Sequence, residues 1–216
     1  MSARFGWNRR APWLLALAAI LTAACGDDEP TGVPEPPDSV PESQLTFLRQ
    51  DVQAPALVTY DTTVIATAGQ QLDLEIRYAA LPGQDSGEKF LEFELDDESL
   101  LSYPPNHPTR PGQLFSPGDT VWIRVVVDPQ LLIATFEPSG LTFNPTEPAE
   151  VEIRYGNADD DYDDDGESDP ELEVEIDLWR QGNPGDDWER SGDLKDLETD
   201  RVRAFLNGFS RYGLGI

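Results

Sequence analysis

The feature that most constrains this chain is a pair of alternating stretches around one acidic segment. Residues 149–155 read Ala-Glu-Val-Glu-Ile-Arg-Tyr, and residues 171–179 read Glu-Leu-Glu-Val-Glu-Ile-Asp-Leu-Trp, so apolar and charged side chains alternate in both. A period of two places successive side chains on opposite faces of a strand, one buried and one in water. Because residues 156–170 between them are rich in Asp, the sequence predicts two antiparallel strands joined by a carboxylate-rich loop.

Similar short stretches recur along the chain, and turns rich in Pro and Gly separate them. A helical apolar stripe is indicated only weakly, over residues 194–206. Many short strands bounded by such turns predict an all-β fold, an antiparallel β-sandwich, with residues 44–216 as one domain. The other predicted strands are residues 45–49, 57–67, 71–79, 89–95, 120–128, 131–137 and 201–205.

The first residues have the pattern of a secretory signal peptide, predicted for residues 1–24. Three arginines and no acid lie in residues 1–10, and a largely apolar run follows that is too short to span a bilayer comfortably. The small residues before Cys25, the only cysteine, resemble a bacterial lipobox. This resemblance implies cleavage before Cys25 and attachment of diacylglycerol to its thiol. The alternative is an incidental thiol at the end of a signal peptide or membrane anchor.

The segment after Cys25 and the overall charge narrow the function classes. Residues 25–43 are rich in Pro and acids, which predicts a disordered linker. Without the predicted signal peptide the net charge falls from −27 to about −30, a field that repels nucleic acid and anionic lipid headgroups. We therefore expect no nucleic-acid partner and membrane contact through acyl chains alone. An extracytoplasmic, lipid-anchored envelope protein is predicted, and Gly26 favours the outer over the inner membrane.

The acidic segment resembles the first nine positions of an EF-hand-type calcium loop, a pattern shared by dockerin and thrombospondin type 3 repeats. Residues 161–169 read Asp-Tyr-Asp-Asp-Asp-Gly-Glu-Ser-Asp and match D-x-D-x-D-G-x-x-D at every fixed position. Calcium prefers six to eight oxygen ligands, and the glycine permits the sharp turn that lets them converge. The predicted Ca²⁺ ligands are the carboxylates of Asp161, Asp163, Asp165 and Asp169 and the backbone carbonyl of Glu167.

The calcium prediction has a departure and an alternative. Leu172 stands where such loops carry a bidentate glutamate, and we expect it in the buried register of the next strand, which makes the site incomplete and weak. Nine carboxylates between Asp159 and Glu171 repel one another and oppose closure of the loop unless a cation neutralises them. The alternative is a solvated, disordered acidic insertion.

Two stretches of the chain resemble ZU5 domains. Residues 136–155 contain a P-x-G-x-x-F turn before an alternating strand, as in the central segment of those domains. Residues 187–215 contain a strand with a tryptophan, followed by a C-terminal motif similar to H-F-S-x-Y. The resemblance covers about residues 120–216 and implies an antiparallel β-sandwich that serves as a binding or scaffolding module. Some members cut themselves between Phe and Ser, but Gly208 replaces the family's histidine before Phe209-Ser210, so we expect no self-cleavage.

The sequence contains no nucleophile elbow, phosphate loop or Cys-His zinc spacing. We therefore expect a non-enzymatic lipoprotein that binds an unknown protein partner or acts as an envelope scaffold, with a structural calcium loop. The alternative is a carbohydrate-binding module with a glycan partner, because Trp122, Trp179 and Trp188 offer aromatic planes that stack on pyranose rings. Tryptophans in strands more commonly pack in the core.

Overall fold

The computed structural model describes residues 38–163, 165–192 and 194–216. The predicted signal peptide, Cys25 and the predicted linker up to residue 37 lie outside the described residues. No helix in the described ranges is long and apolar enough to cross a membrane.

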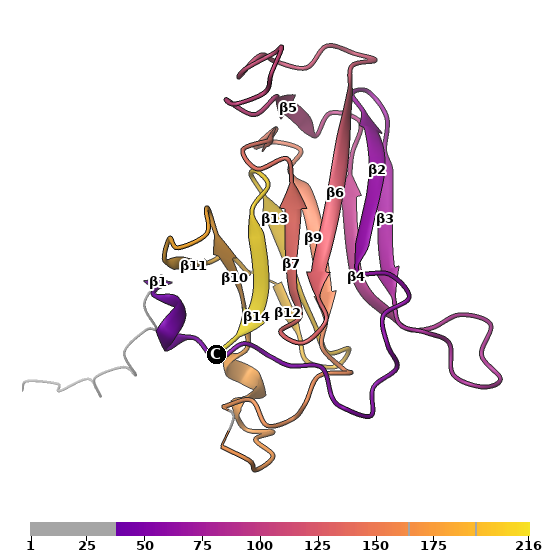
Figure 1. Cartoon of the computed structure of the whole chain (residues 1–216), viewed down its shortest axis with the longest axis vertical. Coiled ribbons are helices and arrows are strands. Elements are labelled where there is room, and N and C mark those ends of the chain that lie inside the picture. Colours follow the sequence, from indigo (N-terminus) through magenta and orange to yellow (C-terminus); the bar gives the residue numbers. More distant parts are fainter. Residues whose placement is uncertain (1–37, 164, 193) are drawn as a thin grey trace, which may run out of the picture. The chain divides into compact units, whose positions relative to one another are not determined.

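Two antiparallel sheets and one small ribbon make up the domain, and the prediction of an all-β sandwich is confirmed (Figure 1). The seven-stranded sheet has the order β1 (Ser39–Val40), β11 (Trp188–Arg190), β10 (Asp177–Gln181), β14 (Arg211–Gly215), β7 (Ile133–Glu137), β6 (Thr120–Asp128), β2 (Asp61–Thr67). The five-stranded sheet has the order β12 (Leu194–Asp196), β13 (Arg201–Leu206), β9 (Ala149–Arg154), β4 (Lys89–Leu95), β3 (Leu72–Arg77). The ribbon pairs β5 (Leu100–Ser102) with β8 (Thr142–Phe143).

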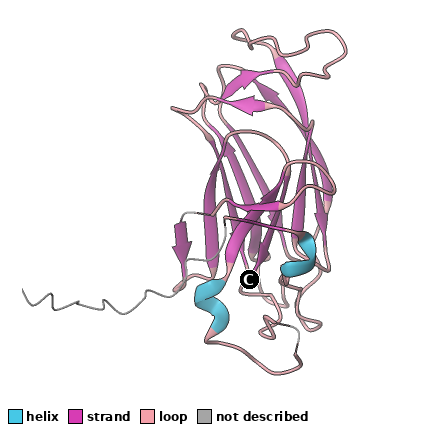
Figure 2. Cartoon of the chain, turned by 90° about the vertical axis from the view of Figure 1, so that its left-hand side faces the viewer, coloured by secondary structure: helices cyan, strands magenta, loops and turns pink. Residues whose placement is uncertain are grey.

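Two single-turn 3₁₀ helices complete the secondary structure of the described residues. They are η1 (Glu42–Gln44) and η2 (Leu172–Glu175), and both lie toward the lower end of the sandwich in Figure 2. The weak helical pattern over residues 194–206 is not realised, since that segment forms β12, a turn and β13. Extended pairing lets it bury one face, with Val202 and Ala204 inaccessible to solvent.

The main core lies between the two sheets and follows the alternation of the sequence. In β6, every second residue from Val121 to Val127 is buried, while Trp122 and Arg124 point outward. Aromatic rings fill the centre, with Phe93, Phe136 and Phe209 in mutual contact at centroid distances of 5.3 to 5.5 Å. Burial of each such ring contributes roughly 1.5–3 kcal/mol, so the three together are a substantial part of the packing energy.

A second, smaller core covers part of the outer face of the seven-stranded sheet. Phe47 packs on Trp188 with ring centroids 4.7 Å apart, and Trp179 donates its indole N–H to the carbonyl of Gly215 at 3.1 Å. The N-terminal segment approaches β14 so closely that a Cβ on Gly215 would lie 2.8 Å from the carbonyl oxygen of Thr46. Residues 39–47, partly within the predicted linker, thus belong to the packed domain.

The predicted hairpin around the acidic segment is wrong. β9 pairs with β4 and β13 in the five-stranded sheet, whereas β10 pairs with β11 and β14 in the seven-stranded sheet. Leu172 is not in a buried strand register but in η2, where its N–H donates to the carbonyl of Asp169 at 2.9 Å. Alternation shows that a strand has one buried face, and either sheet of a sandwich supplies such a face.

Candidate metal centre

The acidic segment forms a compact loop in the connection from β9 to η2. Its neck is closed by the N–H of Asp169, which donates to the carbonyl of Asp160 at 2.8 Å. The hydroxyl of Ser168 donates to a carboxylate oxygen of Asp160 at 2.7 Å. Just before the loop, the N–H of Asp159 donates to the carbonyl of Arg49 at 2.7 Å, so the N-terminal segment supports its base.

Backbone N–H groups hold the carboxylates of the loop in place. Asp161 accepts from the N–H of Asp165 on one oxygen and from the N–H of Gly166 on the other, both at 2.9 Å. Gly166 has a φ of +94°, a left-handed conformation that side chains disfavour, which explains the glycine at the sharp turn. The N–H of Glu167 then donates to Asp165 at 2.9 Å.

Four of the predicted ligands converge. One carboxylate oxygen each from Asp161, Asp163, Asp165 and Asp169 lies within 4.8 Å of the others. Oxygens bound to one calcium ion at 2.3–2.6 Å lie at most about 5 Å apart, so the cluster could hold a metal ion of that size. Glu167 is exposed in the turn, and its predicted contribution is its backbone carbonyl.

Asp169 differs from the other members of the cluster because it is only 9% exposed. Its Oδ2 is buried, and no hydrogen-bond donor from the described residues reaches it. A buried carboxylate oxygen without a partner costs about 1–3 kcal/mol or more when no donor or cation compensates it. This orphaned oxygen fits a bound cation better than it fits a solvated insertion.

The electrostatics of the cluster are unfavourable to four free carboxylates. The pKa of Asp163 is raised, first by its loss of hydration and then by the negative charges of Asp165 and Asp169. Among the described residues, no Arg or Lys side chain forms an ion pair with any of these four carboxylates. A cation would relieve the repulsion that the neighbouring charges create.

One hydrogen bond at the base of the loop was not predicted from the sequence. The hydroxyl of Tyr155, which directly follows β9, donates to Glu173 of η2 at 3.0 Å. Burial, and then this carboxylate, raise the pKa of Tyr155. Glu173 directly follows Leu172, the residue that stands in place of the bidentate glutamate. Its hydrogen bond with Tyr155 therefore links the two ends of the connection. No local motif in the sequence signals this pair.

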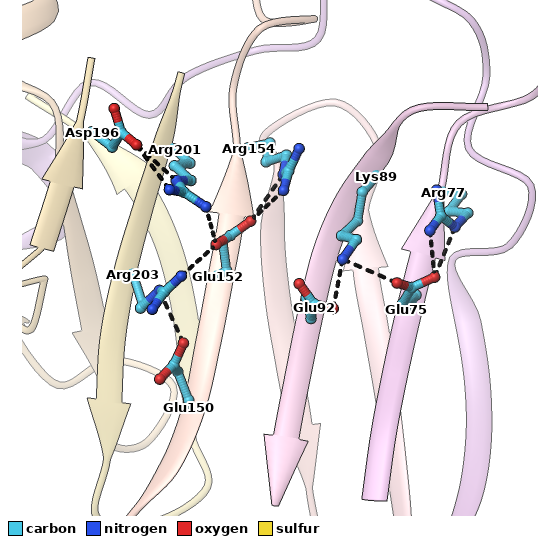
Figure 3. A network of polar contacts seen from close by, with 10 residues as sticks. All are labelled: Glu75, Arg77, Lys89, Glu92, Glu150, Glu152, Arg154, Asp196, Arg201 and Arg203. Atoms are coloured by element: carbon cyan, nitrogen blue, oxygen red, sulfur yellow. Dashed lines mark hydrogen bonds and ion pairs between the residues drawn. The ribbon is translucent and has the colours of Figure 1, made fainter. Parts of the chain in front are cut away.

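A second group of charged residues lies on the five-stranded sheet and contrasts with the loop. Figure 3 shows Glu152 of β9 between arginines from its own strand and from β13. Arg154, Arg201 and Arg203 contact its carboxylate at 2.8, 3.1 and 3.2 Å. Burial raises the pKa of Glu152, but hydrogen bonds from Arg154 and Arg203 and the arginine charges outweigh it, so the pKa lies below its ordinary value. This carboxylate is neutralised within the protein.

The three candidate tryptophans separate into two groups. Trp179 and Trp188 are buried in the second core and leave no plane for a sugar. Trp122 is 65% exposed on the outer face of the seven-stranded sheet. The aromatic planes predicted as one possible set therefore do not form a single face.

Gly208, where the ZU5 resemblance would place a histidine, lies in a crowded position. A Cβ at Gly208 would lie 2.8 Å from the carbonyl oxygen of Leu141, so a larger residue requires the backbone to move. The neighbouring Phe209 and Ser210 are buried, with Phe209 packed in the main core.

Comparisons with protein-family models, with curated proteins and with solved structures found no match for this chain. The resemblance to ZU5 domains and to a lipobox stays a prediction from the sequence.

Proposed function

We propose that this protein is a non-catalytic, lipid-anchored β-sandwich of the bacterial cell envelope that binds or scaffolds other molecules and contains a structural calcium ion. The observation that carries the calcium site is the buried, unpartnered oxygen of Asp169 beside three further carboxylates. The lipobox-like residues before Cys25 support the anchor, and the ZU5-like segments support the binding role.

The ion would act on the fold and not on a reaction. The loop is the crossover between the two sheets, since β9 belongs to one and β10 to the other. A divalent cation held by Asp161, Asp163, Asp165 and Asp169 would remove half of their charge and fix the path of this crossover. Calcium fits the set better than magnesium, because magnesium requires near-ideal octahedral geometry at shorter distances and gives up its waters reluctantly.

Thermal unfolding of the full chain in EDTA and in 1 mM CaCl₂ tests the calcium site. For a dissociation constant near 10⁻⁴ M, occupancy adds about 1.4 kcal/mol to the free energy of unfolding. For a domain of this size the midpoint would rise by about 3 to 6 °C. Magnesium at the same concentration should give a smaller rise.

The double variant Asp163→Asn/Asp165→Asn keeps acceptor oxygens for the turn but removes two charges, and it should lose the calcium-dependent rise. The matched control Asp85→Asn/Asp187→Asn removes two charges from exposed sites elsewhere and should keep the rise. A wild-type midpoint that calcium does not move, or a rise that the loop variant retains, would contradict the proposal.

A carbohydrate-binding module is the second candidate function, and one observation favours it. Trp122 presents a large aromatic side chain to solvent from β6, the strand next to the edge strand β2, and it is not among the residues of the second core.

A further inference from the structure

The outer face of the seven-stranded sheet carries an exposed apolar strip at one edge. Trp122 of β6 lies directly opposite Ile65 of β2 in the strand register, and the two side chains are 65% and 48% exposed. Cross-strand partners on one face have their Cβ atoms about 5 Å apart, so the indole and the isoleucine form one continuous surface. The second core, around Trp179 and Trp188, covers the same face near the opposite edge of the sheet.

Polar side chains follow the strip along the strands: Arg124 lies two residues beyond Trp122 on β6, and Asp61 lies four residues before Ile65 on β2. Arg124 donates from Nε and Nη2 to the two carboxylate oxygens of Asp61 at 2.9 and 2.8 Å, and from Nη1 to Glu137 at 3.1 Å. These contacts span β2, β6 and β7 and hold the guanidinium in one orientation. Both carboxylates are half-exposed, so they keep lone pairs for a ligand.

One open hollow lies along this face. Ile65 and Asp61 are not part of its lining, but Ile65 is the cross-strand partner of Trp122 and Asp61 is bonded to Arg124, and both Trp122 and Arg124 line it. Trp122, Thr63, Arg124, Glu137 and the following Pro138-Ser139 line a volume of about 440 Å³. That volume lies within the range of small-ligand sites, about 300–1,000 Å³. Adjacent rows on one face of a strand are about 7 Å apart, so a ligand stacked on the indole has the polar row within reach of its edge.

We propose that this hollow binds one sugar unit of a neutral, hexopyranose-containing polysaccharide. The apolar C–H face of the ring stacks on Trp122 and Ile65, and the equatorial hydroxyls bond to Arg124, Asp61 and Glu137. This combination of a flat apolar surface with adjacent charged donors and acceptors matches the two sides of a sugar ring. The inference rests on the binding role proposed above and gives that role a ligand class.

The charge of the site selects against other ligands. Arg124 is outnumbered by two carboxylates, and the chain as a whole carries a net charge of −27. Polysaccharides rich in uronate or phosphate are therefore repelled. A second copy of the chain brings the same negative field to the interface, which disfavours self-association through this face.

Affinity electrophoresis of the full chain tests the site. Native gels contain a soluble β-1,3-glucan, a galactomannan or, as the anionic comparison, polygalacturonate. We expect at least one neutral polymer to retard the protein and polygalacturonate to have no effect. Trp122→Ala should weaken the retardation at least tenfold, and Trp122→Phe should restore most of it because a planar ring remains.

The control variant is Phe205→Ala, which removes an aromatic side chain of similar exposure, 48%, from the opposite sheet and should bind as the wild type does. A thermal melt of Trp122→Ala within about 2 °C of the wild type would show that folding is unaffected, as expected for a side chain in water. Retardation by neither neutral polymer, or retardation that Trp122→Ala retains, would overturn the proposal. Retardation by polygalacturonate alone would overturn the proposal that the ligand is a neutral polysaccharide.

Sedimentation velocity of the same variants identifies a competing occupant. Self-association that depends on Trp122 would assign this face to a second copy and overturn the sugar site. A calcium-dependent midpoint without retardation would leave the calcium-stabilised module standing and remove only the sugar site. Retardation without a calcium effect would do the reverse.

Discussion

Two regions of this molecule bury carboxylates, and they differ in whether the protein supplies a countercharge. On the five-stranded sheet, Glu152 is buried among three arginines from β9 and β13, and its pKa is held below the ordinary value. In the loop between the sheets, Asp169 is also buried, yet its Oδ2 has no donor among the described residues. The charge of the first region is balanced by the protein's own arginines, whereas the second region is a cluster that could hold a metal ion.

The difference follows from where the countercharges can come from. A strand has neighbours on both sides, so residues distant in sequence can place an arginine beside a carboxylate. A tight turn is surrounded by its own residues, and here these are aspartates that accept from backbone N–H groups. Glu152 thus has arginines from two strands as countercharges, whereas no described Arg or Lys forms an ion pair with the four clustered aspartates of the loop.

The largest expected effect comes from removing the countercharge on the sheet. Glu152→Gln leaves Arg154, Arg201 and Arg203 close together without the anion that they share. We expect a loss of about 2 to 3 kcal/mol in the free energy of unfolding at pH 7, because the arginines remain partly hydrated and the cost of a fully buried unpaired charge is not reached. Urea denaturation measures it, and a loss below about 0.5 kcal/mol would show that the network adds little.

The pH dependence of that difference sharpens the comparison. Because the pKa of Glu152 is lower in the folded than in the unfolded state, the folded protein binds fewer protons there. The stabilisation is therefore fully present above the unfolded pKa of about 4.5 and is lost as the pH falls through the folded pKa. The difference between the wild type and Glu152→Gln should be largest at pH 7 and should shrink as the pH falls below 4.5. A difference in stability that does not change with pH in this range would assign the effect to packing.

The loop should respond with the opposite sign in the absence of metal. Asp169→Asn replaces the orphaned oxygen with an amide that can donate to the neighbouring carboxylates. In EDTA we expect this variant to be more stable than the wild type by roughly 0.5 to 1 kcal/mol. In 1 mM calcium the order should reverse, because the variant loses a charged ligand. Melts in both buffers measure this, and an unchanged order in the two would break the contrast between the regions.

The smallest effect is expected at a pair that belongs to neither region. Glu189 contacts Arg180 at 3.2 Å, but its side chain is 62% exposed. Exposed pairs contribute about 0.2–1 kcal/mol, so Glu189→Gln should change the free energy of unfolding by less than about 0.5 kcal/mol. Urea denaturation of both variants compares this loss of stability with that of Glu152→Gln. An effect as large as that of Glu152→Gln would mean that burial is not what distinguishes the two.

Local patterns of this sequence predict local structure well. The stretches predicted at residues 89–95 and 120–128 coincide with β4 and β6, because alternation alone defines a strand with one buried face. The spacing of the loop aspartates likewise predicts their convergence, since the positions of ligands around a tight turn depend on neighbouring residues.

Features that depend on distant residues could not be predicted. Nothing in residues 171–179 tells which sheet they join, and the turn η2 interrupts the expected strand. β14 contains two glycines, which normally weaken a strand, but Gly215 is required because the N-terminal segment passes against it. The burial of Asp169 and the tie between Tyr155 and Glu173 also arise from the way the loop folds back on the domain.

The N-terminal segment on the outer face of the seven-stranded sheet has a mechanical consequence. A pulling force applied from the N-terminal side would enter the described part of the domain at β1, which pairs with β11 through two residue pairs beside the hydrogen bond from the N–H of Arg190 to the carbonyl of Asp38. Those pairs are the first to open under tension, and the load then reaches Phe47 on Trp188. We therefore expect the N-terminal edge to lengthen under force before the two sheets separate.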